Sequence, residues 1–115
     1  KRVNQQKLEH FIHRYISDVS AAMAATTILL GDSLGLYKAV ADAGRVRAAD
    51  LAKRLGLSER YVREWLSGQA AGGYVEYDAA ADCFYMSDEQ AFALTNPGSP
   101  IDVAGGFLVA EAMMK

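Results

Sequence analysis

The sequence predicts a mainly α-helical winged helix-turn-helix, with a two-stranded β-hairpin wing and long flanking helices at both ends. Three observations predict it: a helical stripe that ends at Gly56, a second stripe that ends at Gly72-Gly73, and two β-prone runs around a short loop. Helix, tight turn, helix and hairpin in this order make up a winged helix-turn-helix. The order indicates the fold and leaves the function open, because one fold supports many functions.

The composition is that of a globular chain with nearly balanced charge. Of its 115 residues 51% are hydrophobic and 23% charged, and the formal net charge is −2. This balance gives no basic footprint for nucleic acid. The single cysteine, Cys83, cannot form an internal disulfide, and no apolar run reaches the roughly 20 residues of a membrane-spanning helix. We therefore expect a cytoplasmic protein without a membrane partner.

Residues 1–34 predict a long amphipathic helix with an apolar stripe that nothing in the domain covers. Apolar residues recur at steps of three and four from Leu8 onward. The small winged-helix core is expected to be filled by Leu51, Leu55, Val62, Trp65 and Leu66. The stripe thus indicates a second chain or a missing second domain. We expect a homodimer with these interface residues: Phe11, Ile12, Tyr15, Ile16, Val19 and Met23.

A short second helix is expected over residues 36–43. Gly35 suits the position just past the end of the first helix, where the left-handed conformation is common, and Gly44 closes the second helix. Arg47 stands where the next helix needs a cap, and arginine is a poor cap.

The helix-turn-helix follows in residues 48–71. The first helix has one apolar face, formed by Ala48, Leu51, Ala52 and Leu55. Gly56 ends it, and Ser58 is placed to cap the next helix. The inner stripe of that helix comprises Val62, Trp65, Leu66 and Ala70. Residues 74–77 and 83–86 then predict the two strands of the wing, joined by a loop over residues 78–82.

Two capped helices are expected after the wing. Ser87 and Gln90 form a capping box for a short helix through Leu94, and Asn96-Pro97-Gly98 predicts a turn. Ser99 and Pro100 open a last helix. Its Phe107, Leu108, Met113 and Met114 are candidates for the wall of an apolar ligand pocket, and packing on the domain or on a partner chain is the alternative. No stop signal precedes Lys115, so we expect the natural protein to continue.

The motifs of catalysis and cofactor binding are missing from the sequence. It has neither a Gly-x-Gly cofactor loop nor a Gly-Lys-Ser/Thr phosphate loop. Cys83 has no histidine near it in sequence to act as a base, which favours a half-buried strand residue. His10 and His13 share a helix face, but no further metal ligand is evident. We expect no catalytic, cofactor-binding or metal-binding residue in this chain.

A DNA-binding transcriptional regulator is the alternative that a winged helix suggests. In that case Arg60, Tyr61 and Arg63 on the second helix of the motif would contact DNA. Glu59 and Glu64 oppose these arginines locally. The wing loop has an acid at each end and no lysine or arginine, so it would be repelled by a polyanion. Nucleic acid is therefore the less favoured partner.

Three segments resemble one family. They are LGDSLGLYKAVADAG, AADLAKRLGLSERYVREWL and AAGGYVEYD, and they resemble the N-terminal winged-helix domain of bacterial class I S-adenosylmethionine-dependent methyltransferases of the mycobacterial type. The resemblance covers about residues 15–115. In this family the domain forms dimers and closes the substrate pocket over a C-terminal Rossmann-like domain that binds the cofactor. No catalytic residue of the family can be carried over, because this chain stops before that domain.

The resemblance implies a division of the chain into three parts. Residues 1–34 would be a dimerisation helix region, residues 35–95 the winged-helix domain, and residues 96–115 the start of a linker helix towards the missing domain. It also implies S-adenosylmethionine and a small-molecule methyl acceptor as ligands of the full-length protein. The chain alone would be catalytically inert.

Overall fold

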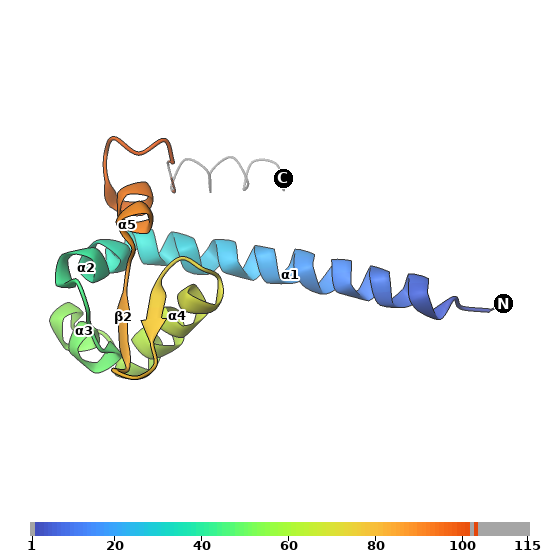
Figure 1. Ribbon diagram of the computed structural model, residues 1–115, viewed down its shortest axis with the longest axis horizontal. Coiled ribbons are helices and arrows are strands. Elements are labelled where there is room, and N and C mark those ends of the chain that lie inside the picture. The colour runs from blue at the N-terminus through green and yellow to red at the C-terminus, as the bar shows by residue number, and fades with distance from the viewer. Residues whose placement is uncertain (1, 102, 104–115) are drawn as a thin grey trace.

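The computed structural model describes residues 2–101 and 103 (Figure 1). The elements follow the order α1 (Gln5–Ser33), α2 (Leu36–Ala43), α3 (Ala48–Leu55), α4 (Glu59–Ala71), β1 (Glu76–Asp78), β2 (Cys83–Tyr85) and α5 (Asp88–Thr95). Helices α2 to α4 and the hairpin form a small body, from which α1 projects as a long rod (Figure 1). The mainly helical winged helix-turn-helix with its two-stranded wing is confirmed.

The ends of α1 follow from local hydrogen bonding. The side chain of Asn4 accepts a hydrogen bond from Lys7 N at 3.0 Å, so the helix begins slightly later than the predicted residue 1. At the other end Gly35 has a φ of 72° and breaks the helix as predicted, so that α2 is bent by 67° from α1. No single helix in the described part of the chain is long and apolar enough to cross a membrane, although the bent pair of α1 and α2 passes by length and composition.

The helix-turn-helix has the predicted turn. Gly56 ends α3 with a φ of 67°, and Ser58 Oγ accepts a hydrogen bond from Tyr61 N at 3.3 Å to cap α4. Arg47 occupies the cap position of α3, and its side chain makes no capping hydrogen bond to the described residues. The first turn of α3 is therefore held by packing, since Ala48 and Leu51 are buried.

The wing is shorter than predicted. β1 and β2 pair antiparallel, with Tyr77 opposite Phe84, and Val46 adds an isolated bridge to Phe84 on the other side. The expected first strand, residues 74–77, begins only at Glu76, because the N–H groups of Tyr74 and Val75 donate to Gln69 O at the end of α4. The expected second strand ends at Tyr85, just before the capping box of α5.

The capping box predicted after the wing is present. Ser87 Oγ accepts from Gln90 N at 3.1 Å, and Gln90 Oε1 accepts from Ser87 N at 2.8 Å. Ser99 Oγ accepts from Ile101 N at 3.0 Å, but Pro100 and Ile101 are not helical, so the predicted helix start at Ser99 is not confirmed. Apart from residue 103, which is helical, the predicted last helix lies outside the described residues.

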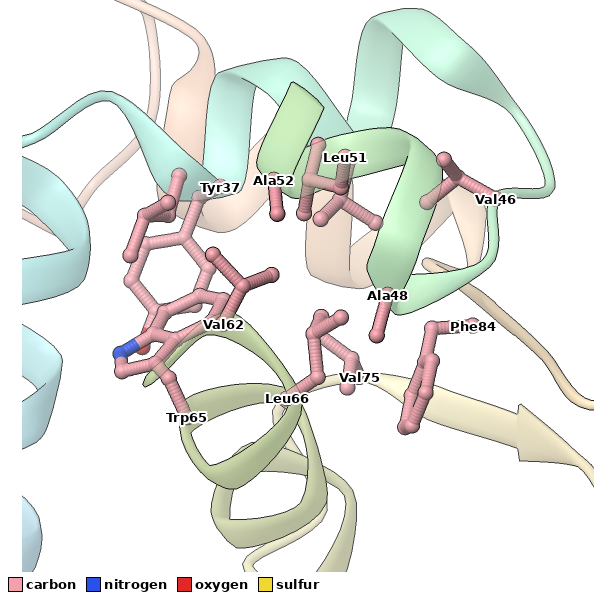
Figure 2. Close-up of a cluster of buried hydrophobic side chains, with 12 residues drawn as sticks. Tyr37, Val46, Ala48, Leu51, Ala52, Val62, Trp65, Leu66, Val75 and Phe84 are labelled. Carbon is pink, nitrogen blue, oxygen red and sulfur yellow. The ribbon is translucent and has the colours of Figure 1, made fainter. Parts of the chain in front are cut away.

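The core lies between α2, α3, α4 and the hairpin (Figure 2). Trp65 is 4% exposed, so the predicted inner face of α4 is confirmed, and Leu55 is only partly buried. The core is larger than the predicted set, because it also holds residues of α2 and β2 and of the segments before α3 and β1: Leu36, Tyr37, Val40, Val46, Val75 and Phe84.

A buried polar network fastens α1 to the body. Trp65 Nε1 donates to Thr27 O at 2.9 Å, and Gln69 Nε2 donates to Thr27 Oγ1 at 3.1 Å. The hydroxyl of Tyr37 donates to Gln69 Oε1. Every buried side-chain polar atom in the described residues has a partner, so the network is complete. Burial raises the pKa of Tyr37 above its usual value of 10.0.

Gly31 allows α1 to approach this network closely. A Cβ atom at Gly31 would overlap with Trp65 Cζ2 and would lie 2.9 Å from Tyr37 Cε2. These rings pack edge to face, with centroids 5.0 Å apart, so neither can move without disturbing the other. Glycine is therefore required here for close contact, and its φ is an ordinary helical one.

We expect Gly31→Ala to lower the free energy of unfolding by about 1–3 kcal/mol, because the added methyl group overpacks the contact. The matched control is Gly68→Ala on α4, where an added Cβ meets no described atom within 4 Å. That control should stabilise the helix by about 0.5–1 kcal/mol. Urea denaturation of both variants measures the difference. Equal effects at the two glycines would contradict the close contact.

We expect Tyr37→Phe to cost about 1–3 kcal/mol at pH 7, because Gln69 Oε1 loses its buried donor. The pKa of Tyr37 is raised in the fold, so its stabilising effect is complete below pH 10 and declines as the pH rises past the pKa of the unfolded state. The wild type should therefore lose more stability than Tyr37→Phe between pH 9 and about 11. Urea titrations across this range test the sign, and a parallel decline would contradict it.

Candidate functional site

The free part of α1 is an exposed arm. Residues 2–26 are all exposed, and burial begins only at Thr27. The exposed fractions of the predicted stripe run from 42% at Val19 to 67% at Met23, and the same set includes Phe11, Ile12, Tyr15 and Ile16. These six large apolar side chains lie on one face of the helix and form a continuous exposed apolar patch. We call this set the arm stripe.

A groove lies at the base of the arm, between α1 and α4. Its volume is about 310 Å³, and its walls are Ser20, Met23, Ala24, Thr27, Ile28, Gly68, Gln69, Gly72 and Tyr74. Gly68 and Gly72 have no side chains, which leaves the surface of α4 hollow at this place. Thr27 and Gln69 already bond to each other, so they offer the groove little unsatisfied polarity. Met23 belongs to both the groove and the arm stripe, which makes them one continuous apolar surface.

The outward face of α4 is locally neutralised. Arg60 Nε lies 3.2 Å from Glu64 Oε1, and Arg63 Nη1 lies 3.9 Å from Asp82 Oδ1 on the wing. Tyr61 is half-buried and packs against the core. The three residues that would contact DNA therefore have contacts within the domain, and the two exposed ion pairs balance part of the charge of the arginines.

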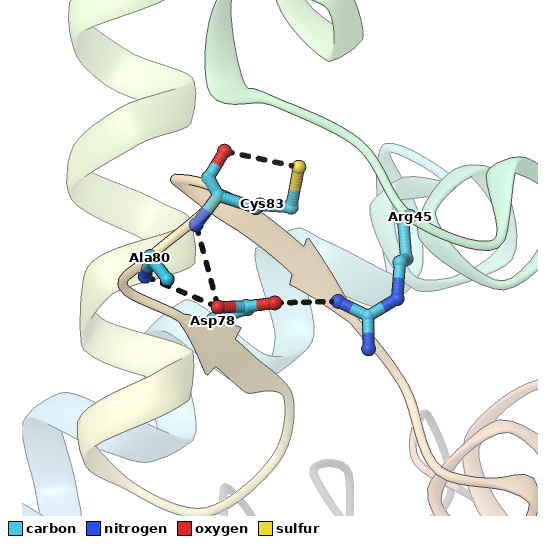
Figure 3. A network of polar contacts seen from close by, with 5 residues as sticks. Arg45, Asp78, Ala80 and Cys83 are labelled. Carbon is cyan, nitrogen blue, oxygen red and sulfur yellow. Dashed lines mark hydrogen bonds and ion pairs between the residues drawn. The ribbon is translucent and has the colours of Figure 1, made fainter.

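The wing loop is tied to the body by its acids (Figure 3). Asp78 Oδ2 accepts from Arg45 Nη1 at 3.0 Å, while Asp78 Oδ1 accepts from the backbone N–H groups of Ala80 and Ala81. Asp82 Oδ1 accepts from the hydroxyl of Tyr77 at 2.9 Å, and this hydrogen bond raises the pKa of Tyr77. The acids therefore shape the loop and bind the arginines of the domain.

Sequence reasoning missed a basic hollow beside α3. It measures about 500 Å³ and is lined by Arg45, Val46, Arg47, Asp50, Lys53, Arg54 and Cys83. In the described part of the chain no carboxylate lies within ion-pair distance of Arg47, Lys53 or Arg54. The charge spacing in residues 45–54 was the available signal, but the overall charge of −2 concealed it.

The remaining candidates within the described residues do not form a catalytic or metal-binding cluster. Cys83 is half-buried on β2, with Sγ 3.4 Å from Ala81 O (Figure 3). His10 and His13 are exposed on the arm, and the described residues contain no cluster of metal-ligating side chains. The pocket-wall candidates Phe107, Leu108, Met113 and Met114 lie outside the described residues, so that prediction stays open.

The fold is shared with solved structures of larger proteins. PigF with SAH has a TM-score of 0.70 and 15% identity, over 95% of this chain and 29% of that one. The mitomycin 7-O-methyltransferase MmcR has a TM-score of 0.67 and 24% identity, over 83% and 28%. RosA from Streptomyces davawensis, an N,N-8-amino-8-demethyl-D-riboflavin dimethyltransferase, has a TM-score of 0.61 and 21% identity, over 92% and 28%. This chain thus spans less than a third of each. These identities establish likeness of fold.

A search among curated proteins finds no significant match. The model of one domain family, described as the Rv2258c-like winged HTH domain, matches residues 20–96. That range covers the helix-turn-helix, the wing and the base of the arm with its groove. The chain belongs to the Rv2258c-like winged helix-turn-helix domain family.

Proposed function

We propose that this chain is the N-terminal dimerisation and substrate-pocket-closing domain of an S-adenosylmethionine-dependent methyltransferase that acts on a small molecule. The observation that supports this most is the occurrence of its fold, over 83–95% of its length, inside chains that include two named methyltransferases. The name of the PigF structure includes SAH, which is consistent with S-adenosylmethionine as the cofactor of the whole protein. Function depends on particular sites, and the sites that the described residues offer for this function are the arm stripe and the groove at its base.

The proposed organisation assigns one task to each segment. Residues 1–34 are the dimerisation region, residues 35–95 the winged-helix domain, and residues 96–115 the start of a linker helix towards a Rossmann-like domain that binds the cofactor. The chain itself binds no cofactor and is catalytically inert under this proposal. We place the protein in the cytoplasm, which suits its single, unpaired cysteine.

The dimer is supported by the exposure of the arm stripe. Each large apolar side chain that leaves water contributes about 1.5–3 kcal/mol, so six of them favour association strongly. The stripe lies on a helix that projects from the body (Figure 1), so a partner can reach it without displacing any other element of the described residues. A homodimer buries the arm stripes of both chains at once, because a two-fold interface uses the same surface of each chain.

The competing proposal is a DNA-binding transcriptional regulator. The helix-turn-helix supports this proposal. The ion pairs of Arg60 and Arg63 count against it, because their carboxylate partners reduce the positive charge available to a phosphate backbone. A shift assay on random DNA at rising salt separates the two proposals. A regulator binds at moderate salt and loses affinity log-linearly as salt rises.

We expect Ile16→Asp to convert the dimer into a monomer at micromolar concentration, because the substitution places a charge in the arm stripe. The control is Ser17→Asp, which adds the same charge on the opposite face of the helix, with His10 and His13. Sedimentation of the 115-residue chain measures both. A wild-type monomer, or equal effects of the two substitutions, would contradict dimerisation through this face.

We expect Phe107→Ala in the full-length enzyme to raise the KM for the methyl acceptor, because the variant removes an aromatic wall from the proposed pocket. Affinity for S-adenosylmethionine should not change, since the cofactor would bind in the other domain. Steady-state kinetics and cofactor titration measure the two effects separately. Equal losses for both ligands, or a lower melting temperature with unchanged kinetics, would assign Phe107 to the core.

A further inference from the structure

We propose that the basic hollow beside α3 binds a small molecule that carries a phosphate or diphosphate group. The hollow measures about 500 Å³, a volume typical of small-molecule sites. Its lining residues differ from those of the groove at the base of the arm, so its occupancy does not depend on the proposed dimer. Four cationic side chains and one carboxylate line it: Arg45, Arg47, Lys53, Arg54 and Asp50.

The segment before α3 forms the first wall of the hollow. Val46 N donates to Phe84 O at 3.0 Å and Phe84 N donates to Val46 O at 2.8 Å, so the bridge to β2 fixes the backbone here. Arg47 is extended, with a φ of −87° and a ψ of 152°. Successive side chains of an extended segment alternate in direction. Val46 is buried in the core, and Arg45 and Arg47 on either side of it are exposed.

Helix α3 forms the second wall. Asp50, Lys53 and Arg54 have the spacing i, i+3 and i+4, which places them on one face of the helix, while Leu51 on the opposite face is buried. A carboxylate four residues before an arginine is well placed to pair with it. In the described residues, however, no carboxylate lies within 4.0 Å of the cationic groups of Arg47, Lys53 or Arg54. Three cations therefore face the hollow without a neutralising neighbour.

The acids of the wing stand at the edge of the hollow and favour a small ligand. Arg45 Nη1 lies 3.0 Å from Asp78 Oδ2 (Figure 3), and its guanidinium lies 4.3 Å from the centre of the Tyr85 ring. Asp82 directly precedes Cys83, which also lines the hollow. An extended polyanion such as DNA would meet these carboxylates and be repelled. A small anion fits between the two walls and avoids them.

The number of free cations favours phosphate over carboxylate. A carboxylate carries a single negative charge, whereas a phosphate monoester carries about −1.5 to −2 and offers three acceptor oxygens. The planar guanidinium of arginine donates to two such oxygens at once, and lysine acts as a point charge. Arg47 on the first wall, with Lys53 and Arg54 on the second, matches the charge of one phosphate or diphosphate group.

Calorimetric titration of the 115-residue chain with pyrophosphate tests the site. Pyrophosphate should bind, and Arg47→Gln and Arg54→Gln should each weaken binding about tenfold, because each variant removes charge-assisted hydrogen bonds. The matched control is Arg60→Gln, which removes the same charge from α4 outside the hollow and should leave binding unchanged. All three side chains are exposed, so the variants should keep the fold. Equal weakening by all three, or no binding to the unmodified chain, would overturn the proposal.

Two competitors at equal ionic strength test the class of ligand. Malonate, a dicarboxylate, should displace pyrophosphate at least tenfold more weakly than inorganic phosphate does, and random duplex DNA should not displace it. Malonate as effective as phosphate would overturn the assignment to phosphate. Displacement by DNA that is lost in Arg47→Gln and Arg54→Gln would make the hollow part of a polyanion-binding surface, and would overturn the assignment to a small molecule.

Discussion

The contact of Gly31 with the rings of Trp65 and Tyr37 is the constraint on which the rest of the structure depends. It allows the backbone of α1 to lie directly on the core, where Thr27 can then accept from both Trp65 and Gln69. The three helices α1, α2 and α4 are thereby joined at one point. A larger residue at position 31 would lift α1 off the core and leave several buried polar groups without partners.

This junction decides which surfaces the domain offers. Because α1 is fixed only from Thr27 onward, everything before it stands free of the body. The groove exists for the same reason, since it is the space beside the junction that no side chain of α4 fills. On the face that a winged helix would turn towards DNA, the exposed side chains of Arg63 and Asp82 form an ion pair between α4 and the wing. Most of the exposed large apolar side chains in the described residues lie instead on α1.

Local patterns were enough to predict most of the fold. Helix ends at Gly35, Gly56 and Ser58 follow from backbone chemistry within a few residues, so the sequence reveals them directly. The arm stripe was also predictable, because exposure follows from periodicity and from the small size of the core. Contacts between distant segments were not predictable. Gln69 stands as a polar residue within the apolar stripe of α4, and its hydrogen-bond partners Thr27 and Tyr37 are visible only in the fold. Arg45 and Arg63 likewise reach the wing acids across the fold.

The single attachment of α1 makes it a lever. From Gly31 to Gln5 the helix extends roughly 39 Å, so a rotation of about 5° at the junction moves the tip by roughly 3 Å. A change in the packing of Trp65 or Tyr37, too small to alter the core, would therefore be amplified along the rod. In an assembly of two such chains, each α1 helix would transmit a movement at its own junction to the body of the partner subunit. Mechanical linkage between subunits would then require no contact between the bodies themselves.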